Sequence, residues 1–242
     1  MKLSNRTMIF VALCVLFTCP LSLSAQWNKK PYTEWSEKEA TKLLESSPWG
    51  QTQVFSDTSN EFGTGRRGNV TATDPNSVDY SSHHLNIRIR LLSAIPVRQA
   101  FARLITLAQK GNMNKQLEER LKAFASQDFP DYIIISVDGE SQESKSEIRE
   151  FRALLDTRTT ADLKNNTYLA GKNGQRVFIA EYQSPKKDNL GAKLIFPRLV
   201  DGQPFITPET EEIHFYSEMS SKYKLDMRFK VKDMTYQGKL EY

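Results

Sequence analysis

The side chains that could carry chemistry in this chain form few recognisable patterns. The run Gly63–Val70 matches G-x-G-x-x-G, a pattern of loops that hold phosphates. In dinucleotide-binding proteins this loop follows a strand and opens a helix, whose N-terminus receives the pyrophosphate. Here a loop is expected over 69–76 instead, with Pro75 inside it. A kinase would also need H-R-D and D-F-G motifs, which the sequence lacks. We therefore expect no nucleotide binding at this run.

The histidines and carboxylates do not form a recognisable catalytic or metal site. Adjacent strand residues point to opposite faces, so His83 and His84 cannot bind one ion from a regular strand. His214 stands alone, and the sequence has neither H-E-x-x-H nor a G-x-S-x-G elbow. Asp138 and Glu140 share one face of a strand end, which acid–base chemistry could use, but a polar turn at Asp138-Gly139-Glu140 explains them better. The sequence predicts no catalytic, metal-binding or cofactor-binding residue.

A basic face is the one constellation that could bind a partner. In the strand expected over 85–91, basic residues alternate with apolar ones, and the same holds for the strand expected over 222–232. If the two strands share a sheet, one surface carries Arg88, Arg90, Lys224, Arg228, Lys230 and Lys232. Such a surface could meet an anionic partner, for example an acidic glycan or a lipid headgroup. A solvated face is the simpler interpretation and the main expectation, because sheets use lysines on strands to avoid pairing with other chains.

The first 25 residues predict an export signal. Lys2 and Arg6 precede an apolar run over 8–17, and Ala25 is a small residue suited to cleavage. The run is shorter than the roughly 20 residues that span a membrane. Losing Lys2 and Arg6 lowers the formal net charge from +4 to +2, which does not favour nucleic acid as a partner. We expect a periplasmic or secreted protein without a transmembrane span.

Both cysteines, Cys14 and Cys19, lie within this predicted signal. A chain cleaved after Ala25 would have no cysteine, which excludes a disulfide scaffold, a thiolate zinc site and a cysteine nucleophile. Cys19 could instead be lipidated, which would anchor the protein to a membrane. The preceding residues 16–18 are atypical of a lipidated cysteine, so cleavage without lipidation is the main expectation.

The segment with the most distinctive sequence is predicted to be a short helix flanked by tryptophans. Ser36 and Glu39 have the spacing of a capping box, apolar residues follow at helical spacing from Ala40, and Pro48 excludes a continuing helix. These signals predict a helix over about 37–46. The three tryptophans around it are Trp27, Trp35 and Trp49. They could form a ligand platform, but large aromatic residues more often pack, so we expect an N-terminal clasp on the core.

The remaining pattern predicts an α+β fold with a mainly antiparallel sheet. Helices are expected from Pro96 to about 110, around 117–124 and over 145–156, and the unbroken apolar run Ile133–Ile135 predicts a central strand. The last third reads as strands joined by turns, with a hairpin at Asn173-Gly174. Further strands are expected over 51–55, 176–182, 193–196, 212–218 and 236–242. We predict one domain over 26–242, with a flexible loop insertion over 56–82.

Four segments resemble a family of exported acidobacterial proteins that has no assigned activity. They are Lys30–Trp49, with its W-S-E-K-E-A…S-P-W pattern, Ala94–Ala100, Phe196–Arg198 and Lys232–Leu240. The resemblance implies a bacterial, exported protein and supplies no site residue. Together the observations predict a non-enzymatic binding or structural module of the cell envelope or secreted fraction. Its partner would be an anionic envelope component or another envelope protein, docked in the second case through exposed aromatic residues. A hydrolase with an unrecognised carboxylate or histidine site is the alternative.

Overall fold

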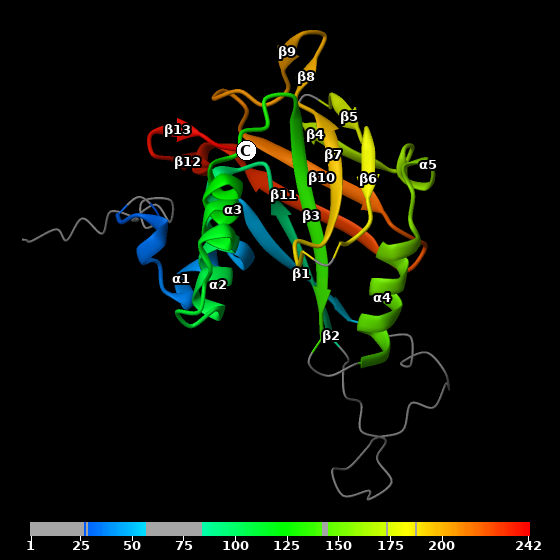
Figure 1. Ribbon diagram of the computed structural model, residues 1–242. Coiled ribbons are helices and arrows are strands. Elements are labelled where there is room, and N and C mark those ends of the chain that lie inside the picture. The colour runs from blue at the N-terminus through cyan, green and yellow to red at the C-terminus, as the bar shows by residue number, and fades with distance from the viewer. Residues whose placement is uncertain (1–26, 28, 57–83, 142–144, 173, 187) are drawn as a thin grey trace, which may run out of the picture.

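The fold of the chain is known from a computed structural model (Figure 1). It describes residues 27, 29–56, 84–141, 145–172, 174–186 and 188–242. The predicted export signal, the loop over 57–82 and His83 lie outside the described residues.

Two antiparallel sheets form the body of the protein, which confirms the predicted α+β class. The five-stranded sheet has the order β1 (Gly50–Ser56), β2 (His84–Leu91), β3 (Tyr132–Glu140), β7 (Ala192–Pro197) and β6 (Glu181–Gln183). The four-stranded sheet has the order β11 (Lys224–Lys230), β10 (Glu212–Glu218), β4 (Thr167–Gly171) and β5 (Arg176–Phe178). Two short hairpins complete the strands: β8 (Leu199–Val200) with β9 (Gln203–Pro204), and β12 (Thr235–Tyr236) with β13 (Lys239–Leu240).

The main hydrophobic core draws residues from both sheets. Leu85, Ile87 and Ile89 of β2 are buried, while the residues between them point to the opposite, outer face. Phe196 of the five-stranded sheet meets Phe215 of the four-stranded sheet edge to face, with ring centroids 6.3 Å apart. All of Ile133–Ile135 is buried in β3, as expected for a central strand covered on both faces.

The two sheets are joined along both of their sides. On one side the chain passes from β5 to β6 between sheets. The amide of Ile179 bonds to Thr167 in the four-stranded sheet, and the amide of Ala180 bonds to Ile195 in the five-stranded sheet. On the other side, the glutamines Gln51 and Gln53 of β1 bond to the backbone of β11.

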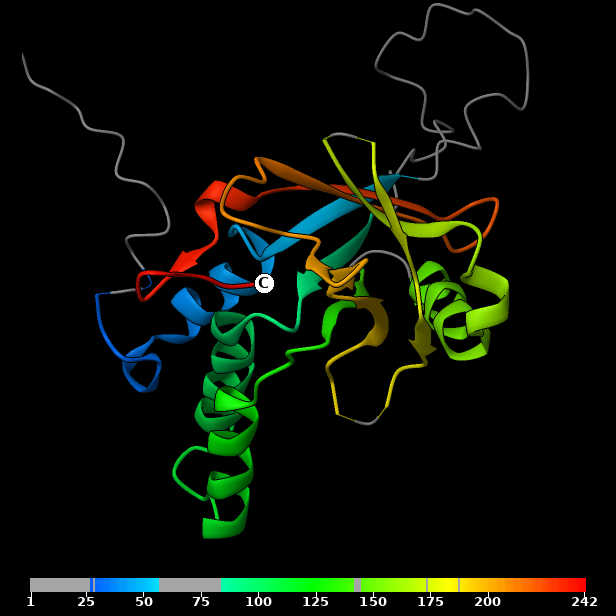
Figure 2. The ribbon, with the colours of Figure 1, turned by 90° about the horizontal axis from the view of Figure 1, so that it is seen from above.

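In the described part of the chain, five helices accompany the sheets: α1 (Glu37–Glu45), α2 (Ile95–Ala108), α3 (Lys115–Ser126), α4 (Lys145–Thr157) and α5 (Thr160–Leu163). The same residues also include the 3-10 turns η2 (Tyr32–Glu34) and η4 (Val231–Asp233). Figure 2 shows α2 and α3 projecting from the body on the side away from β10 and β11. The helix α4 lies at the opposite end of the five-stranded sheet (Figure 1).

The tryptophan-flanked helix forms as predicted. Ser36 Oγ accepts from the amide of Glu39, and Glu39 Oε2 accepts from the amide of Ser36, so both halves of the capping box are present. All three tryptophans are buried, and Trp49 Nε1 donates to the carbonyl of Glu241 at 2.8 Å. The rings pack as an N-terminal clasp, so neither Trp27 nor Trp49 offers an exposed patch for docking.

The prediction of a strand over 236–242 was wrong. The structure has the hairpin β12–β13 there, because Gln237 and Gly238 adopt positive φ angles of 50° and 78° and turn the chain. The strand β11 also ends at Lys230, two residues earlier than expected, and Val231 begins the 3-10 turn η4.

Candidate functional site

A cleft of about 640 Å³ lies against the outer face of the five-stranded sheet. Its floor contains Arg88, Arg90 and Asp138. One wall is apolar and comes from α2, namely Phe101, Leu104, Ile105 and Ala108. The opposite wall is polar and comes from α4 and the chain before β7; it includes Arg152, Asp156, Lys186, Asp188 and Asn189. The volume is within the range of sites that bind small ligands.

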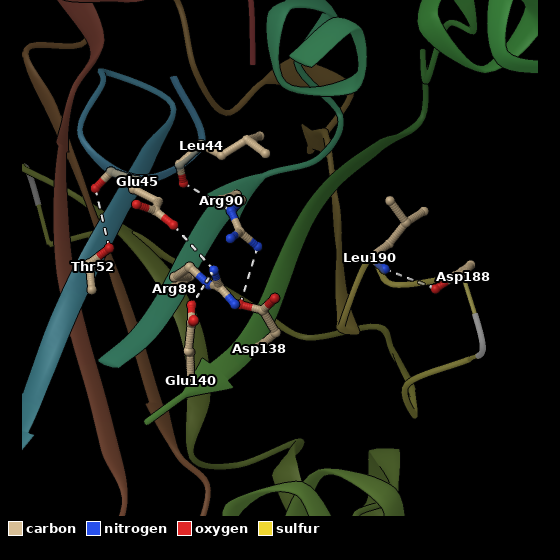
Figure 3. A network of polar contacts seen from close by, with 9 residues as sticks. All are labelled: Leu44, Glu45, Thr52, Arg88, Arg90, Asp138, Glu140, Asp188 and Leu190. Atoms are coloured by element: carbon tan, nitrogen blue, oxygen red, sulfur yellow. Dashed lines mark hydrogen bonds and ion pairs between the residues drawn. The ribbon is translucent and has the colours of Figure 1, made fainter. Parts of the chain in front are cut away.

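Arg88 is the centre of the ionic network on this floor (Figure 3). Antiparallel pairing places it directly opposite Asp138, whose Oδ1 accepts from Arg88 Nε at 2.9 Å. Arg88 Nη1 also lies 3.1 Å from Glu45 Oε1 and 2.8 Å from Glu140 Oε2. Burial lowers the pKa of Arg88, but the neighbouring carboxylates outweigh it and raise the pKa above its usual value. Arg88 thereby joins the end of α1 to two strands of the sheet.

Arg90 is almost completely buried, with 2% of its surface exposed. Its Nε donates to the carbonyl of Leu44 at 2.9 Å, near the C-terminus of α1, where a helix dipole favours a cation. The guanidinium lies over the ring of Phe101, 5.3 Å from its centroid. Nη1 is 3.3 Å from Asp138 Oδ1 but makes no hydrogen bond with a described residue. Burial lowers the pKa of Arg90, and the attraction of Asp138 only partly offsets this effect.

The charges that line the cleft balance one another. Four cationic side chains, Arg88, Arg90, Arg152 and Lys186, face four carboxylates, Glu45, Asp138, Asp156 and Asp188. On the floor these groups are engaged with one another, and Asp188 accepts from Lys193 at 2.9 Å. Among the described residues, Arg152 and Lys186 have no ion-pair partner, and both side chains are exposed. Both cations therefore lie on the wall opposite α2, which also carries Asp156, a carboxylate without an ion-pair partner among the described residues.

The predicted basic face does not form, because its two strands lie in different sheets. Arg88 and Arg90 belong to the five-stranded sheet, whereas β11 is the edge of the four-stranded sheet. On β11, Lys224 lies 3.7 Å from Glu218 and Arg228 lies 2.8 Å from Glu212. Lys230 and Lys232 are exposed and have no ion-pair partner within the described ranges. The six residues are thus divided between the cleft and a separate segment, in which two of the four cations are ion-paired.

The remaining candidate residues are also engaged in local contacts. His214 Nε2 lies 2.7 Å from Asp226 Oδ1 across the β10–β11 pair. Asp138 and Glu140 share one face of β3, as expected, and both contact Arg88. No cluster of three or more histidine, cysteine or acidic residues suited to a metal ion is found in the described part of the chain.

The walls of the cleft were not foreseen from the sequence. Leu104 and Ile105 follow Phe101 at helical spacing, which predicts one buried stripe on the helix α2. The structure leaves Leu104 and Ile105 partly exposed along the cleft, while Phe101 is buried beside Arg90. The width of that stripe was the only signal for this wall, since part of a wide stripe can remain outside the core.

No protein-family model, curated protein or solved structure matches this chain. Within the described residues, no helix has the length and apolar character needed to cross a membrane.

Proposed function

We propose that this protein is a non-enzymatic binding module of the bacterial cell envelope or secreted fraction, and that the cleft is its binding site. The observation that carries the proposal is the pairing of an apolar wall on α2 with a floor of fixed, opposite charges. Clefts that bind small ligands usually combine apolar walls with a few well-placed polar groups. The ligand would be amphipathic, with its apolar part along Leu104 and Ile105.

The unpaired cations support an anionic group on this ligand. Arg152 and Lys186 lie on the wall opposite α2, where a headgroup would reach them while its apolar part packs on Leu104. Arg88 is already surrounded by three carboxylates and is poorly placed to take a further anion. An anionic envelope component therefore remains the proposed partner, with its charged end at Arg152 and Lys186. The proposal that the protein is exported depends on the sequence pattern of its first 25 residues.

The floor favours binding over catalysis. A general acid or base must be free to exchange its proton with a substrate. Asp138 is instead held by two guanidinium groups, and Glu45 and Glu140 are held by Arg88. The hydrolase alternative would have to use Asp156, since Asp188 is paired with Lys193.

Binding of amphipathic probes to the purified protein tests the proposal. Laurate, dodecyl phosphate and uncharged dodecyl maltoside, each below its micelle concentration, would be titrated by calorimetry. We expect the two anionic probes to bind more tightly than the maltoside, and Leu104→Glu to abolish their binding. Leu199→Glu, at an exposed leucine of β8, is the matched control and should bind normally.

Two results would contradict the proposal. One is binding that is equal in the Leu104→Glu and Leu199→Glu proteins, or absent from the wild type. The other is turnover of a dodecanoyl ester that Asp156→Asn abolishes, which would favour the hydrolase instead.

A further inference from the structure

The outer face of the four-stranded sheet carries a row of aromatic rings. Tyr216 of β10 is the direct partner of Tyr168 in β4, which in turn is the partner of Phe178 in β5. The two tyrosine rings are stacked with centroids 5.3 Å apart, and the rings of Tyr168 and Phe178 meet at 5.8 Å. Phe178 is 44% exposed. Among the described elements, no helix packs over this face (Figure 2).

Charged groups surround this row, and each described carboxylate on β10 and β11 lies beside a basic side chain. The guanidinium of Arg176 lies over the ring of Tyr168, 4.4 Å from its centroid. Three polar pairs cross from β10 to β11 on the same face: His214 with Asp226, Arg228 with Glu212, and Lys224 with Glu218. Lys230, also on this face of β11, is exposed and has no ion-pair partner among the described residues. The face thus offers many hydrogen-bond donors and acceptors with little net charge.

The hydroxyl groups of the two tyrosines add to this polar character. Neither Tyr168 nor Tyr216 forms a hydrogen bond through its hydroxyl with another described residue, and both side chains are half-buried. A phenol of this kind presents an apolar ring together with a polar tip. The row therefore alternates apolar surface with groups that can donate and accept hydrogen bonds.

We propose that this face binds a neutral polysaccharide chain laid across the strands. The C–H groups of a sugar ring carry slight positive charge and pack well against the negative face of an aromatic ring. Sugar hydroxyls both donate and accept, so they can bond to the paired carboxylates and cations without breaking a charge balance.

The carboxylates on this face decide between this occupant and the others. A nucleic acid or an anionic lipid surface gains most of its affinity from unpaired lysines and arginines. On this face Arg228 and Lys224 are paired with carboxylates that would repel an anionic polymer. Among its described side chains, only Arg176 and Lys230 are cations without such a partner. The uncharged chain is therefore the occupant that the face fits best.

This site is separate from the cleft. The cleft lies on the outer face of the five-stranded sheet, and the aromatic row lies on the outer face of the other sheet. The two faces point away from each other across the shared core, so ligands of both kinds could be held at once. A variant that no longer binds at one site can therefore still be tested for binding at the other.

Affinity gel electrophoresis of the purified full chain tests the proposal, with dextran, laminarin or hydroxyethylcellulose cast into the gel. Polygalacturonate serves as the anionic comparison. We expect retardation by at least one neutral polymer, and a roughly threefold to tenfold loss of affinity in Phe178→Ala and again in Tyr216→Ala. Tyr132→Ala removes a ring of similar exposure from β3 and should not change the retardation.

Three outcomes would overturn the proposal. The first is the absence of retardation by every neutral polymer. The second is retardation that survives in the Phe178→Ala, Tyr216→Ala double variant, or that only polygalacturonate causes. The third is a wild-type dimer in light scattering that the double variant loses, which would assign the face to a second copy of the chain. Circular dichroism would show that each variant is folded.

Discussion

Gln53 in β1 accepts a hydrogen bond from the backbone amide of Asp226 in β11, at 3.0 Å, although the two strands belong to different sheets. The same side chain donates through Nε2 to the carbonyl of Lys224 at 2.9 Å. One amide side chain thereby replaces a pair of backbone hydrogen bonds where the two sheet edges meet. Because exposed edges invite pairing with other chains, this seam also protects both edges.

Replacing Gln53 by alanine should weaken the seam. Two hydrogen bonds are lost at once, so we expect the free energy of unfolding to fall by about 1–2 kcal/mol. Urea denaturation followed by tryptophan fluorescence measures this change. Gln183→Ala is the control and should cost under about 0.5 kcal/mol, because Nε2 of Gln183 bonds to Glu181 on the same short strand and, among the described residues, to no other group. Equal stability of the two variants would show that the hydrogen bonds of Gln53 add nothing to the free energy of unfolding.

The capping box of α1 should give the stability a defined pH dependence. The ammonium of Lys30, together with the amide and hydroxyl of Ser36, lowers the pKa of Glu39 from 4.5 to about 2. Because the pKa is lower in the folded state, the stabilisation is complete above pH 4.5 and is lost as the pH falls toward 2. Glu39→Gln should remove this part of the dependence in thermal unfolding curves. Glu34→Gln, at an exposed position of η2, should keep it.

Local patterns predicted the elements well, because they depend on neighbouring residues. The spacing of Ser36 and Glu39 sets the start of α1, and the alternation from Leu85 to Leu91 sets which side of β2 is buried. Neither pattern says which sheet a strand joins. The alternation of β11 is the same beside β2 or beside β10, so the division of the predicted basic face was not readable from sequence.

The cleft could not be predicted from the sequence, for a related reason. Leu104 and Phe101 belong to one apolar stripe, and hydropathy does not distinguish a residue that packs in the core from one that lines a cleft. The site also requires α4 and the chain around Lys186 to lie opposite α2. These segments are far apart in sequence, so their meeting depends on the tertiary fold.

Gly139 in β3 leaves room for the ring of Phe151 on α4. A Cβ atom at this position would lie 2.6 Å from Phe151 Cδ1, closer than two carbon atoms can pack. Gly139→Ala should therefore lower the free energy of unfolding by about 1–3 kcal/mol. Phe151→Leu creates space at the same point, so the double variant should lose less stability than the two single changes added together. Strict additivity in chemical denaturation would contradict this contact.

Arg90 should stabilise the junction between α1 and the sheet. Arg90→Met keeps an apolar stem against Phe101 but leaves the carbonyl of Leu44 without its donor and Asp138 with one cation fewer. Removing one member of a buried ion pair typically costs about 3–5 kcal/mol, and we expect about 3 kcal/mol here because Arg88 still contacts Asp138. Amide hydrogen exchange should also become faster over α1. Arg152→Met removes an exposed arginine from the rim of the same cleft and should change stability by less than about 0.5 kcal/mol. If Arg90→Met were as stable as this control, the cost of burying the guanidinium would cancel its contacts, and the end of α1 would be held by Arg88 and the tryptophans instead.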